Sequence, residues 1–422
     1  MSVISSLRPL VIGFAALALA ITAASRAQAE SKLLIDAATG KVLFAENATR
    51  PWYPASVTKL MTTYTTLRAI KEGRVSFNTL LTVSPEAAAQ PPTKMGFRPG
   101  THVTIDNALK MMLVKSANDM AVTIAEGVGG SVAGFADMMN ANASRLGMTQ
   151  SHFVNPNGLP AENHFTSARD IGILARALMQ EFPQDDFYWH IHSIRYGTRV
   201  IHNYNKLLDR YPGADGMKTG FICASGYNLV GSATRNGHRL IAIVFGAYSG
   251  KARTQEAAEL LERGFNSSAL AWLTPSLGTV DELKPIAAEP PDLHDQMCGP
   301  HRHKPPSEDN DEEAVAANGD SDSTHAFMLS SLTGDKFVLG PPVDTTPPMV
   351  VFTGPADHPD VVSATVSAKP KHHRKKPAAS AKSKHPQKAA AHTRAKATPQ
   401  NKRAKKQPRK PAKKTKVDTA KQ

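Results

Sequence analysis

Three short polar motifs constrain the fold of this 422-residue chain more than any other feature of its sequence. They are Ser56-Val57-Thr58-Lys59, Ser116-Ala117-Asn118 and Lys218-Thr219-Gly220, and they lie far apart along the chain. Each motif is short enough to occur by chance in many unrelated proteins. If the three act together, the fold must bring three distant segments to one crevice.

The first motif has the residue types of an activated nucleophile. Residues three apart on a helix share a face, so Lys59 Nζ can reach Ser56 Oγ. A serine hydroxyl is a weak nucleophile until a base takes its proton. A lysine amine can do so if burial and a nearby cation favour its neutral form, and we expect Lys218 to be that cation. Taken alone, the pair would more often be an N-cap serine and a solvated lysine.

The sequence segments that follow a known pattern are longer than the three motifs themselves. Together with the order and spacing of the motifs, segments 54–62, 153–159 and 215–220 resemble the D-alanyl-D-alanine carboxypeptidases, the low-molecular-weight penicillin-binding proteins. The resemblance runs from about residue 31 to about residue 270. It implies an α/β (α+β) fold of the β-lactamase and transpeptidase type, in which helices flank an antiparallel sheet.

The resemblance also implies roles for individual residues. The implied catalytic residues are Ser56, Lys59 and Ser116, and the implied substrate-binding residues are Asn118, Lys218, Thr219, Gly220, Phe221 and Arg253. Ser116 would relay a proton to the leaving amine, and Asn118 would orient Lys59 and contact a substrate amide. Read without the resemblance, this second motif is a loop with helix-capping residues.

The third motif would lie on a strand at the edge of the crevice. Lys218 and Thr219 would bind the terminal carboxylate of the substrate, and Gly220 would let the acyl chain lie close to the backbone. The N–H of Phe221 would be a second oxyanion donor. Arg253 would bind the carboxylate from between the last strand and the closing helix. The simpler alternatives are an exposed strand end and an ordinary surface arginine.

The implied reaction is acyl transfer on a peptidoglycan stem peptide. Ser56 would attack the carbonyl of the penultimate D-alanine, the terminal D-alanine would leave, and water would cleave the acyl-enzyme. Penicillins imitate this end of the substrate and should acylate Ser56. The resemblance implies neither metal nor cofactor.

Three other functions stay open. A DD-endopeptidase acting on cross-links would use the same groups. A class A β-lactamase would need a glutamate in a Glu-x-x-Leu-Asn context, and the nearest acid, Glu162, has different neighbours. A non-enzymatic envelope-binding scaffold would act through the basic end of the chain.

The apolar pattern predicts strands at both ends of the domain and helices between them. The predicted strands are 33–36, 42–45, 227–233 and 239–247. One helix is predicted to begin near Ser56. Further helices are predicted over 105–112, 120–126, 133–146, 166–179 and 256–265. Asn236-Gly237 predicts a tight turn between the last two strands. An antiparallel sheet assembled from distant parts of the chain fits this order.

The first 29 residues have the features of an export signal. Arg8 precedes an apolar run over 10–24, and Ala27-Gln28-Ala29 is a small-residue cleavage site. A membrane anchor is the alternative. We expect the mature protein in the periplasm or at the outer face of the cytoplasmic membrane.

Beyond the predicted catalytic domain (30–270) the composition changes. Segment 271–367 is a low-complexity polar linker whose short apolar islands leave room for partial folding, and 368–422 reads as a disordered tail rich in Lys, Ala and Pro. Residues 369–421 carry 20 Lys or Arg against one acid, so this part holds +19 and the rest of the chain −5 of the net +14. Behind an export signal, such a tail favours an anionic membrane or envelope polymer over nucleic acid. A solvated tail without a partner is the alternative.

Two cysteines, Cys223 and Cys298, can form a disulfide or remain two thiols. Several residues of types that bind metals lie near Cys298 in the sequence: Asp292, His294, Asp295, His301 and His303. Their spacing repeats no tight-binding pattern, so we predict no metal site there.

Overall fold

A computed structural model describes residues 30–266, 277–300, 339–343 and 346–360. The predicted export signal and the basic tail lie outside these ranges. The elements in chain order are β1 (Ser31–Asp36), β2 (Val42–Glu46), η1 (Ala55–Thr58), α2 (Lys59–Lys71), β3 (Leu80–Thr82), α3 (Pro85–Ala89), β4 (His102–Thr104), α4 (Ile105–Val114), α5 (Asn118–Gly129), α6 (Val132–Arg145), α7 (Ala168–Glu181), η2 (Pro183–Trp189), β5 (Ser193–Tyr196), β6 (Arg199–His202), α8 (Leu207–Arg210), β7 (Ala214–Ile222), β8 (Gly226–Arg235), β9 (His238–Ala247), α9 (Gly250–Asn266), η5 (Val280–Glu282), α10 (His294–Cys298) and β10 (Met349–Val351).

The main sheet has five antiparallel strands in the order β2-β1-β9-β8-β7. Its strands come from both ends of the domain, which confirms the predicted arrangement. Asn236 and Gly237 have positive φ angles of 51° and 77°, as a tight hairpin turn requires. The order leaves β7, the strand that carries the third motif, at the edge of the sheet.

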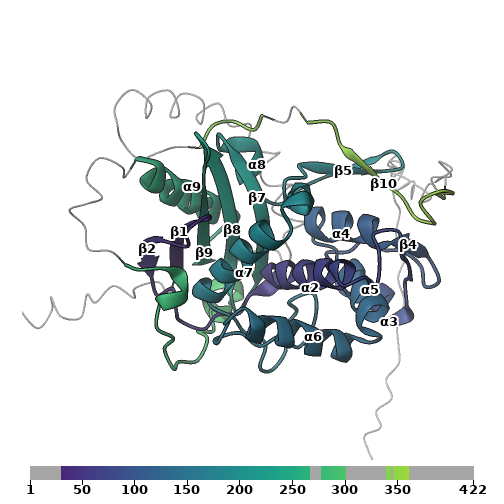
Figure 1. Ribbon diagram of the computed structural model, residues 1–422, viewed down its shortest axis with the longest axis horizontal. Helices are drawn as coiled ribbons and strands as arrows, with labels where there is room; N and C mark the ends of the chain where they lie inside the picture. The colour runs from purple at the N-terminus through teal and green to yellow at the C-terminus, as the bar shows by residue number, and fades with distance from the viewer. Residues whose placement is uncertain (1–29, 267–276, 301–338, 344–345, 361–422) are drawn as a thin grey trace, which may run out of the picture. The chain divides into compact units, whose positions relative to one another are not determined.

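One helix covers each face of this sheet (Figure 1). A Cβ added at Gly172 of α7 would meet Leu33 and Ile35, whereas one added at Gly264 of α9 would meet Leu34. Successive side chains of a strand point to opposite faces. The unbroken apolar run in β1 therefore reflects burial on both sides of the strand.

A second group of helices packs around α2, which contacts α4, α5, α6 and α7. Ten of its thirteen residues are buried, and several of these are threonines. Their hydroxyls are satisfied locally: Thr63 and Thr66 donate to carbonyls one turn earlier, Lys59 O and Thr62 O. The first motif therefore leads into a helix that packs against other helices on several sides.

The starts of α7 and α9 differ from the sequence prediction because serine caps set them. Ser167 accepts from Asp170 N, so α7 begins at Ala168 rather than at 166. The predicted start of the closing helix at 256 is wrong by six residues. Ser249 accepts from Ala252 N, and α9 begins at Gly250.

Parts of the region after residue 270 lie against the domain. Val42 N donates to Gly278 O and Val280 N donates to Gly40 O, which ties η5 to the β1–β2 turn. Leu293 N donates to Ala224 O. Further on, β10 pairs in parallel with β5. Within the described ranges no helix is long and apolar enough to cross a bilayer.

Candidate active site

The first motif opens on a 3₁₀ turn, η1, which leads directly into α2. Residues three apart are eclipsed in a 3₁₀ helix, and Lys59 Nζ lies 2.8 Å from Ser56 Oγ. Lys59 is fully buried, whereas Ser56 is partly exposed. The hydroxyl is therefore accessible from outside while the amine behind it is shielded.

Three oxygen atoms surround the Lys59 amine. Besides Ser56 Oγ they are Asn118 Oδ1 at 2.8 Å and the main-chain carbonyl of Asn157 at 3.0 Å. These hydrogen bonds help to fix the position of Nζ. The Asn157 carbonyl was missed by the sequence analysis, because a main-chain oxygen leaves no mark in residue type.

The second motif joins the third through a side-chain contact. Ser116 lies in the break between α4 and α5, with a positive φ of 57°. Its Oγ accepts a hydrogen bond of 3.0 Å from Lys218 Nζ, which also donates to Thr219 O at 2.9 Å. Both Ser116 and Lys218 are buried. Because Asn118 of the same motif contacts Lys59, the two amine–hydroxyl pairs stand in one site.

Strand β7 passes very close to the η1 turn at Gly220. A Cβ at this position would lie 2.8 Å from Ser56 N, 3.0 Å from Val57 N and 3.1 Å from Pro54 O. All three are main-chain atoms that cannot move aside, so only glycine fits. The structure thus joins the first and third motifs by backbone approach.

The remaining predicted residues lie along the same strand or behind it. Thr219 is buried, and the ring of Phe221 packs on Tyr227 with centroids 4.3 Å apart. Arg253 is not between the last strand and the closing helix, as predicted; it lies in the first turn of α9, because that helix starts early. Its Nη1 is 3.4 Å from Gly220 O, so the guanidinium contacts the main chain of the motif strand.

A loop before α4 supports the second motif. Asn118 N donates to Thr93 O at 2.8 Å, and Thr93 Oγ1 donates to Ser116 O at 2.7 Å. The buried carboxylate of Asp119 accepts from Met95 N at 3.0 Å and from Gly96 N at 2.8 Å. Asp119 directly follows the motif in sequence, and its position at a helix start was the available signal.

His164 contacts the first motif through Thr58. Its Nδ1 accepts from Val154 N at 3.0 Å, so Nε2 carries the hydrogen and donates to Thr58 Oγ1 at 2.9 Å. Burial, with a smaller contribution from His152, lowers the pKa of His164 to about 4. The ring is therefore neutral at pH 7. Nothing in the sequence marked this histidine.

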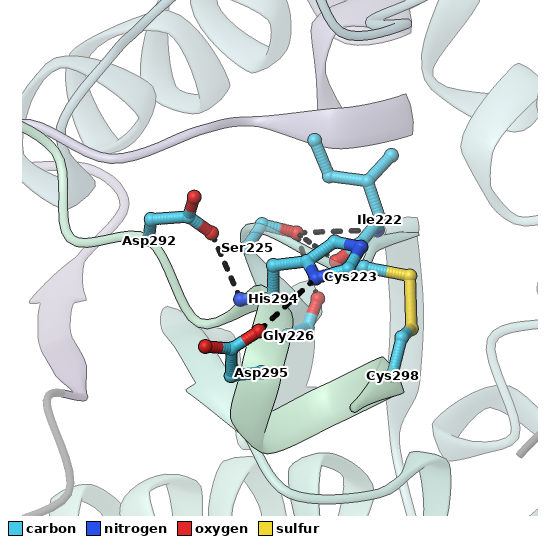
Figure 2. The surroundings of a disulfide bond; sticks show 8 residues. All are labelled: Ile222, Cys223, Ser225, Gly226, Asp292, His294, Asp295 and Cys298. Carbon is cyan, nitrogen blue, oxygen red and sulfur yellow. Dashed lines mark hydrogen bonds and ion pairs between the residues drawn. A yellow bond between two sulfur atoms is a disulfide. The ribbon is translucent and has the colours of Figure 1, made fainter. Parts of the chain in front are cut away.

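A disulfide joins Cys223, at the end of β7, to Cys298 (Figure 2). Because Cys298 is in this disulfide, it cannot act as a thiolate ligand to a metal ion. Of the nearby candidate ligands, His301 and His303 lie outside the described residues. Among the residues placed by the structure, no group of three or more His, Cys, Asp or Glu could hold a metal ion. Glu162, the acid considered for a β-lactamase, is exposed and lines an open cavity beside Ala55.

The chain is similar in sequence to known proteins. A family model for D-alanyl-D-alanine carboxypeptidase matches residues 19–249, more than half of the chain. The chain is 34% identical over 243 residues to the D-alanyl-D-alanine carboxypeptidase DacF of Bacillus subtilis. That alignment covers 57% of this chain and 62% of the relative, so the chain matches about three fifths of the relative's length.

Solved structures show the same likeness. The crystal structure of D-alanyl-D-alanine carboxypeptidase DacD from Francisella tularensis has a TM-score of 0.55 and 30% identity, covering 56% of this chain and 70% of that one. Penicillin-binding protein D2 of Listeria monocytogenes in its cefotaxime-bound form has a TM-score of 0.51 and 27% identity, covering 56% of this chain and 96% of that one.

Proposed function

The chain belongs to the D-alanyl-D-alanine carboxypeptidase family, and on this premise we propose that it removes the terminal D-alanine from peptidoglycan stem peptides. One observation carries the proposal. A buried lysine amine lies 2.8 Å from a partly exposed serine hydroxyl, and a second amine–hydroxyl pair, Lys218 and Ser116, lies in the same site. This arrangement suits acyl transfer by a serine nucleophile.

In the first step Ser56 Oγ attacks the carbonyl carbon of the penultimate D-alanine. Lys59 takes the hydroxyl proton as the new C–O bond forms. The carbonyl oxygen becomes an oxyanion, which the N–H groups of Ser56 and Phe221 stabilise. The close approach of β7 to the Ser56 turn at Gly220 supports this pairing of donors.

In the second step the C–N bond breaks and the terminal D-alanine leaves. Its amine receives a proton through Ser116, whose hydroxyl is bonded to Lys218. Water then attacks the ester carbonyl, with Lys59 as base, and releases the shortened stem and the Ser56 hydroxyl. Asn118 holds Lys59 in place throughout, as its 2.8 Å contact suggests.

The strand motif supplies the carboxylate site. Lys218 and Thr219 bind the carboxylate of the terminal D-alanine by charge and hydrogen bonding. Arg253 stays a predicted carboxylate ligand; its contact with Gly220 O keeps positive charge close to this strand. Penicillins, whose carboxylate and amide imitate the same end, acylate Ser56.

The setting of the reaction follows from the sequence alone. We propose export through residues 1–29 and action in the periplasm or at the outer face of the cytoplasmic membrane. Binding of an anionic membrane or envelope polymer by the basic tail stays a prediction, since 368–422 lie outside the described residues. DD-endopeptidase activity uses the same catalytic groups and is tested with a cross-linked dimer as substrate.

Mass spectrometry after exposure to a labelled penicillin tests the proposal. We expect a mass gain on the peptide that holds Ser56, and none in a Ser56→Ala variant. Slow release of the label supports a carboxypeptidase, and rapid turnover of penicillin supports a β-lactamase. No label, together with no release of D-alanine from a D-Ala-D-Ala peptide, would leave the scaffold alternative.

A further inference from the structure

A third buried lysine, Lys115, lies next to the candidate site. It directly precedes Ser116 at the C-terminal end of α4, and it is 8% exposed. Its Nζ donates a hydrogen bond of 2.9 Å to the phenol oxygen of Tyr204, which is 4% exposed. A buried cation is costly unless hydrogen bonds satisfy it, so this contact helps to fix the far end of the lysine side chain.

The loop that carries Tyr204 is tied to the strand of the third motif. Asn205 Nδ2 donates to Gly216 O at 2.9 Å, near the start of β7. On the other side of the tyrosine, Asn203 N donates to His192 O at 2.7 Å. Both asparagines are buried. Tyr204 therefore lies between two anchored neighbours, one of which is bonded to β7.

These contacts join the second motif to the third motif a second time. The direct link is the hydrogen bond from Lys218 Nζ to Ser116 Oγ. The other link runs from Lys115 through Tyr204 and the residue after it to the main chain of β7. Together with the main chain, the two links close a ring. The position of the Ser116 hydroxyl relative to Lys218 therefore depends on both links.

The main chain at Ser116 needs such support. Its φ of 57° is in the left-handed region, which a residue other than glycine keeps only where its surroundings hold it there. Thr93 Oγ1 donates to the Ser116 carbonyl at 2.7 Å and restrains the following peptide. The contact between Lys115 and Tyr204 restrains the preceding residue. It therefore opposes a rotation of the main chain that would turn the Ser116 hydroxyl away.

We propose that Lys115 and Tyr204 are positioning residues, which hold the Ser116 hydroxyl where it can pass a proton to the leaving group. The inference rests on the proposed function, because it assumes that Ser116 is the proton relay. In this role neither side chain touches the reacting atoms. Loss of their contact should slow departure of a leaving group that needs a proton more than it slows attack by Ser56.

Two substrates that differ only in the leaving group separate these effects. One is a peptide that ends in D-Ala-D-Ala, and the other is its thioester, in which thiolactate of the same configuration replaces the last residue. In both, a bond forms between Ser56 Oγ and the carbonyl carbon. In the amide the C–N bond breaks and the amine must receive a proton. In the thioester the C–S bond breaks and the sulfur keeps the electron pair, because a thiol with a pKa of about 8.5 leaves as a thiolate.

The measured quantity is kcat/KM for the amide divided by kcat/KM for the thioester, on the whole protein. Tyr204→Phe and Lys115→Met should each lower this ratio about three- to tenfold, the effect of one lost hydrogen bond. Lys115→Arg can still donate to the phenol and should keep most of the ratio. Both rates scale with the amount of folded protein, so the ratio also tests a variant that folds poorly.

Matched controls remove contacts of the same kind from the start of α4. The buried Tyr188 donates from its phenol to Asp106 Oδ1 at 2.8 Å, and Lys110 Nζ donates to Asp106 Oδ2 at 2.6 Å. Tyr188→Phe and Lys110→Met should each leave the ratio at the wild-type value, because neither contact reaches Ser116. Ser116→Ala should lower the ratio further than any of the positioning variants.

Labelling of wild-type Ser56 by penicillin, together with hydrolysis of both substrates, tests the proposed function separately. If Ser116→Ala lowers the ratio but Tyr204→Phe and Lys115→Met keep it, this inference is overturned and the relay stands. An equal fall of the ratio in Tyr188→Phe would also overturn it, because any disturbance of α4 would then have the same effect. A wild-type protein that neither labels nor hydrolyses either substrate would overturn the proposed function and this inference with it.

Discussion

Lys218 Nζ donates a 3.0 Å hydrogen bond to Ser116 Oγ across 102 residues of sequence. The amine belongs to an edge strand and the hydroxyl to a break between two helices, and both side chains are buried. The contact fixes the position of the Ser116 hydroxyl and places an amine beside it, which the motif by itself does not supply.

Removing this hydroxyl tests its part in the chemistry. Ser116→Ala should slow acylation by a labelled penicillin by about 10²- to 10⁴-fold, the range for a lost acid–base group. The measurement is the rate of label incorporation on Ser56. Ser144→Ala, an exposed serine of α6, is the control and should label like the wild type. A rate within about twofold of wild type in Ser116→Ala would argue against a proton relay.

The close approach of β7 to the nucleophile predicts the effect of a single methyl group. Gly220→Ala would place Cβ 2.8 Å from Ser56 N, so strand and turn must separate. We expect acylation to fall by at least about tenfold, because the oxyanion donors move apart. Gly172→Ala is the control, since its new methyl would meet only side-chain methyls, at 3.1 to 3.4 Å. Normal labelling of Gly220→Ala would show that the strand is not held against the turn.

The Asp119 carboxylate should matter for stability and for the site together. In Asp119→Asn the amide nitrogen would face a main-chain N–H of Met95 or Gly96 and leave it without an acceptor. We expect a loss of about 1–3 kcal/mol in the free energy of unfolding, together with slower acylation. Urea denaturation and penicillin labelling measure the two effects. Asp137→Asn on the exposed face of α6 is the control; an equal effect there would exclude a positional role for Asp119.

His164 predicts how stability depends on pH. Its pKa is about 4 in the folded protein and 6.5 in an unfolded chain, so between these values only the unfolded chain binds the proton. Stability supplied by the neutral ring is therefore complete above pH 6.5 and is lost as the pH falls toward 4. The slope of this contribution approaches about 1.4 kcal/mol per pH unit.

The comparison with a His164→Gln variant isolates this group from other titrating residues. Urea denaturation at pH 7, 5.5 and 4 should show the wild type losing more stability than the variant over this interval. Parallel curves for the two proteins would mean that His164 can be protonated in the folded state without cost.

The disulfide should stabilise the protein because it links the segment around Cys298 to the end of β7. The double variant Cys223→Ser/Cys298→Ser should lose about 2–4 kcal/mol in the free energy of unfolding. The wild type measured with a reductant should match the variant measured without one. If reductant lowers the stability of both proteins equally, the bond is not the cause.

Local patterns in the sequence were enough to predict most strands of the main sheet. Runs of apolar residues identified β1, β2, β8 and β9, and a turn of two residues suited to positive φ predicted how the last two join. The Ser56–Lys59 contact was also predictable, because residues three apart on a helical turn must share a face. The predicted start of α9 and the predicted location of Arg253 were wrong, because the Ser249 cap starts the helix six residues before the predicted position.

The sequence alone determined which side chains are candidates for the chemistry and in what order they occur, since residue type and local spacing are properties of the chain itself. The tertiary structure alone decided what surrounds them: the Asn157 carbonyl at Lys59, the loop clamped by Asp119, and the pairing of Cys223 with Cys298. These contacts join segments whose separation follows no local rule. They depend on how sheet and helices pack, and main-chain groups take part in them without any trace in residue type.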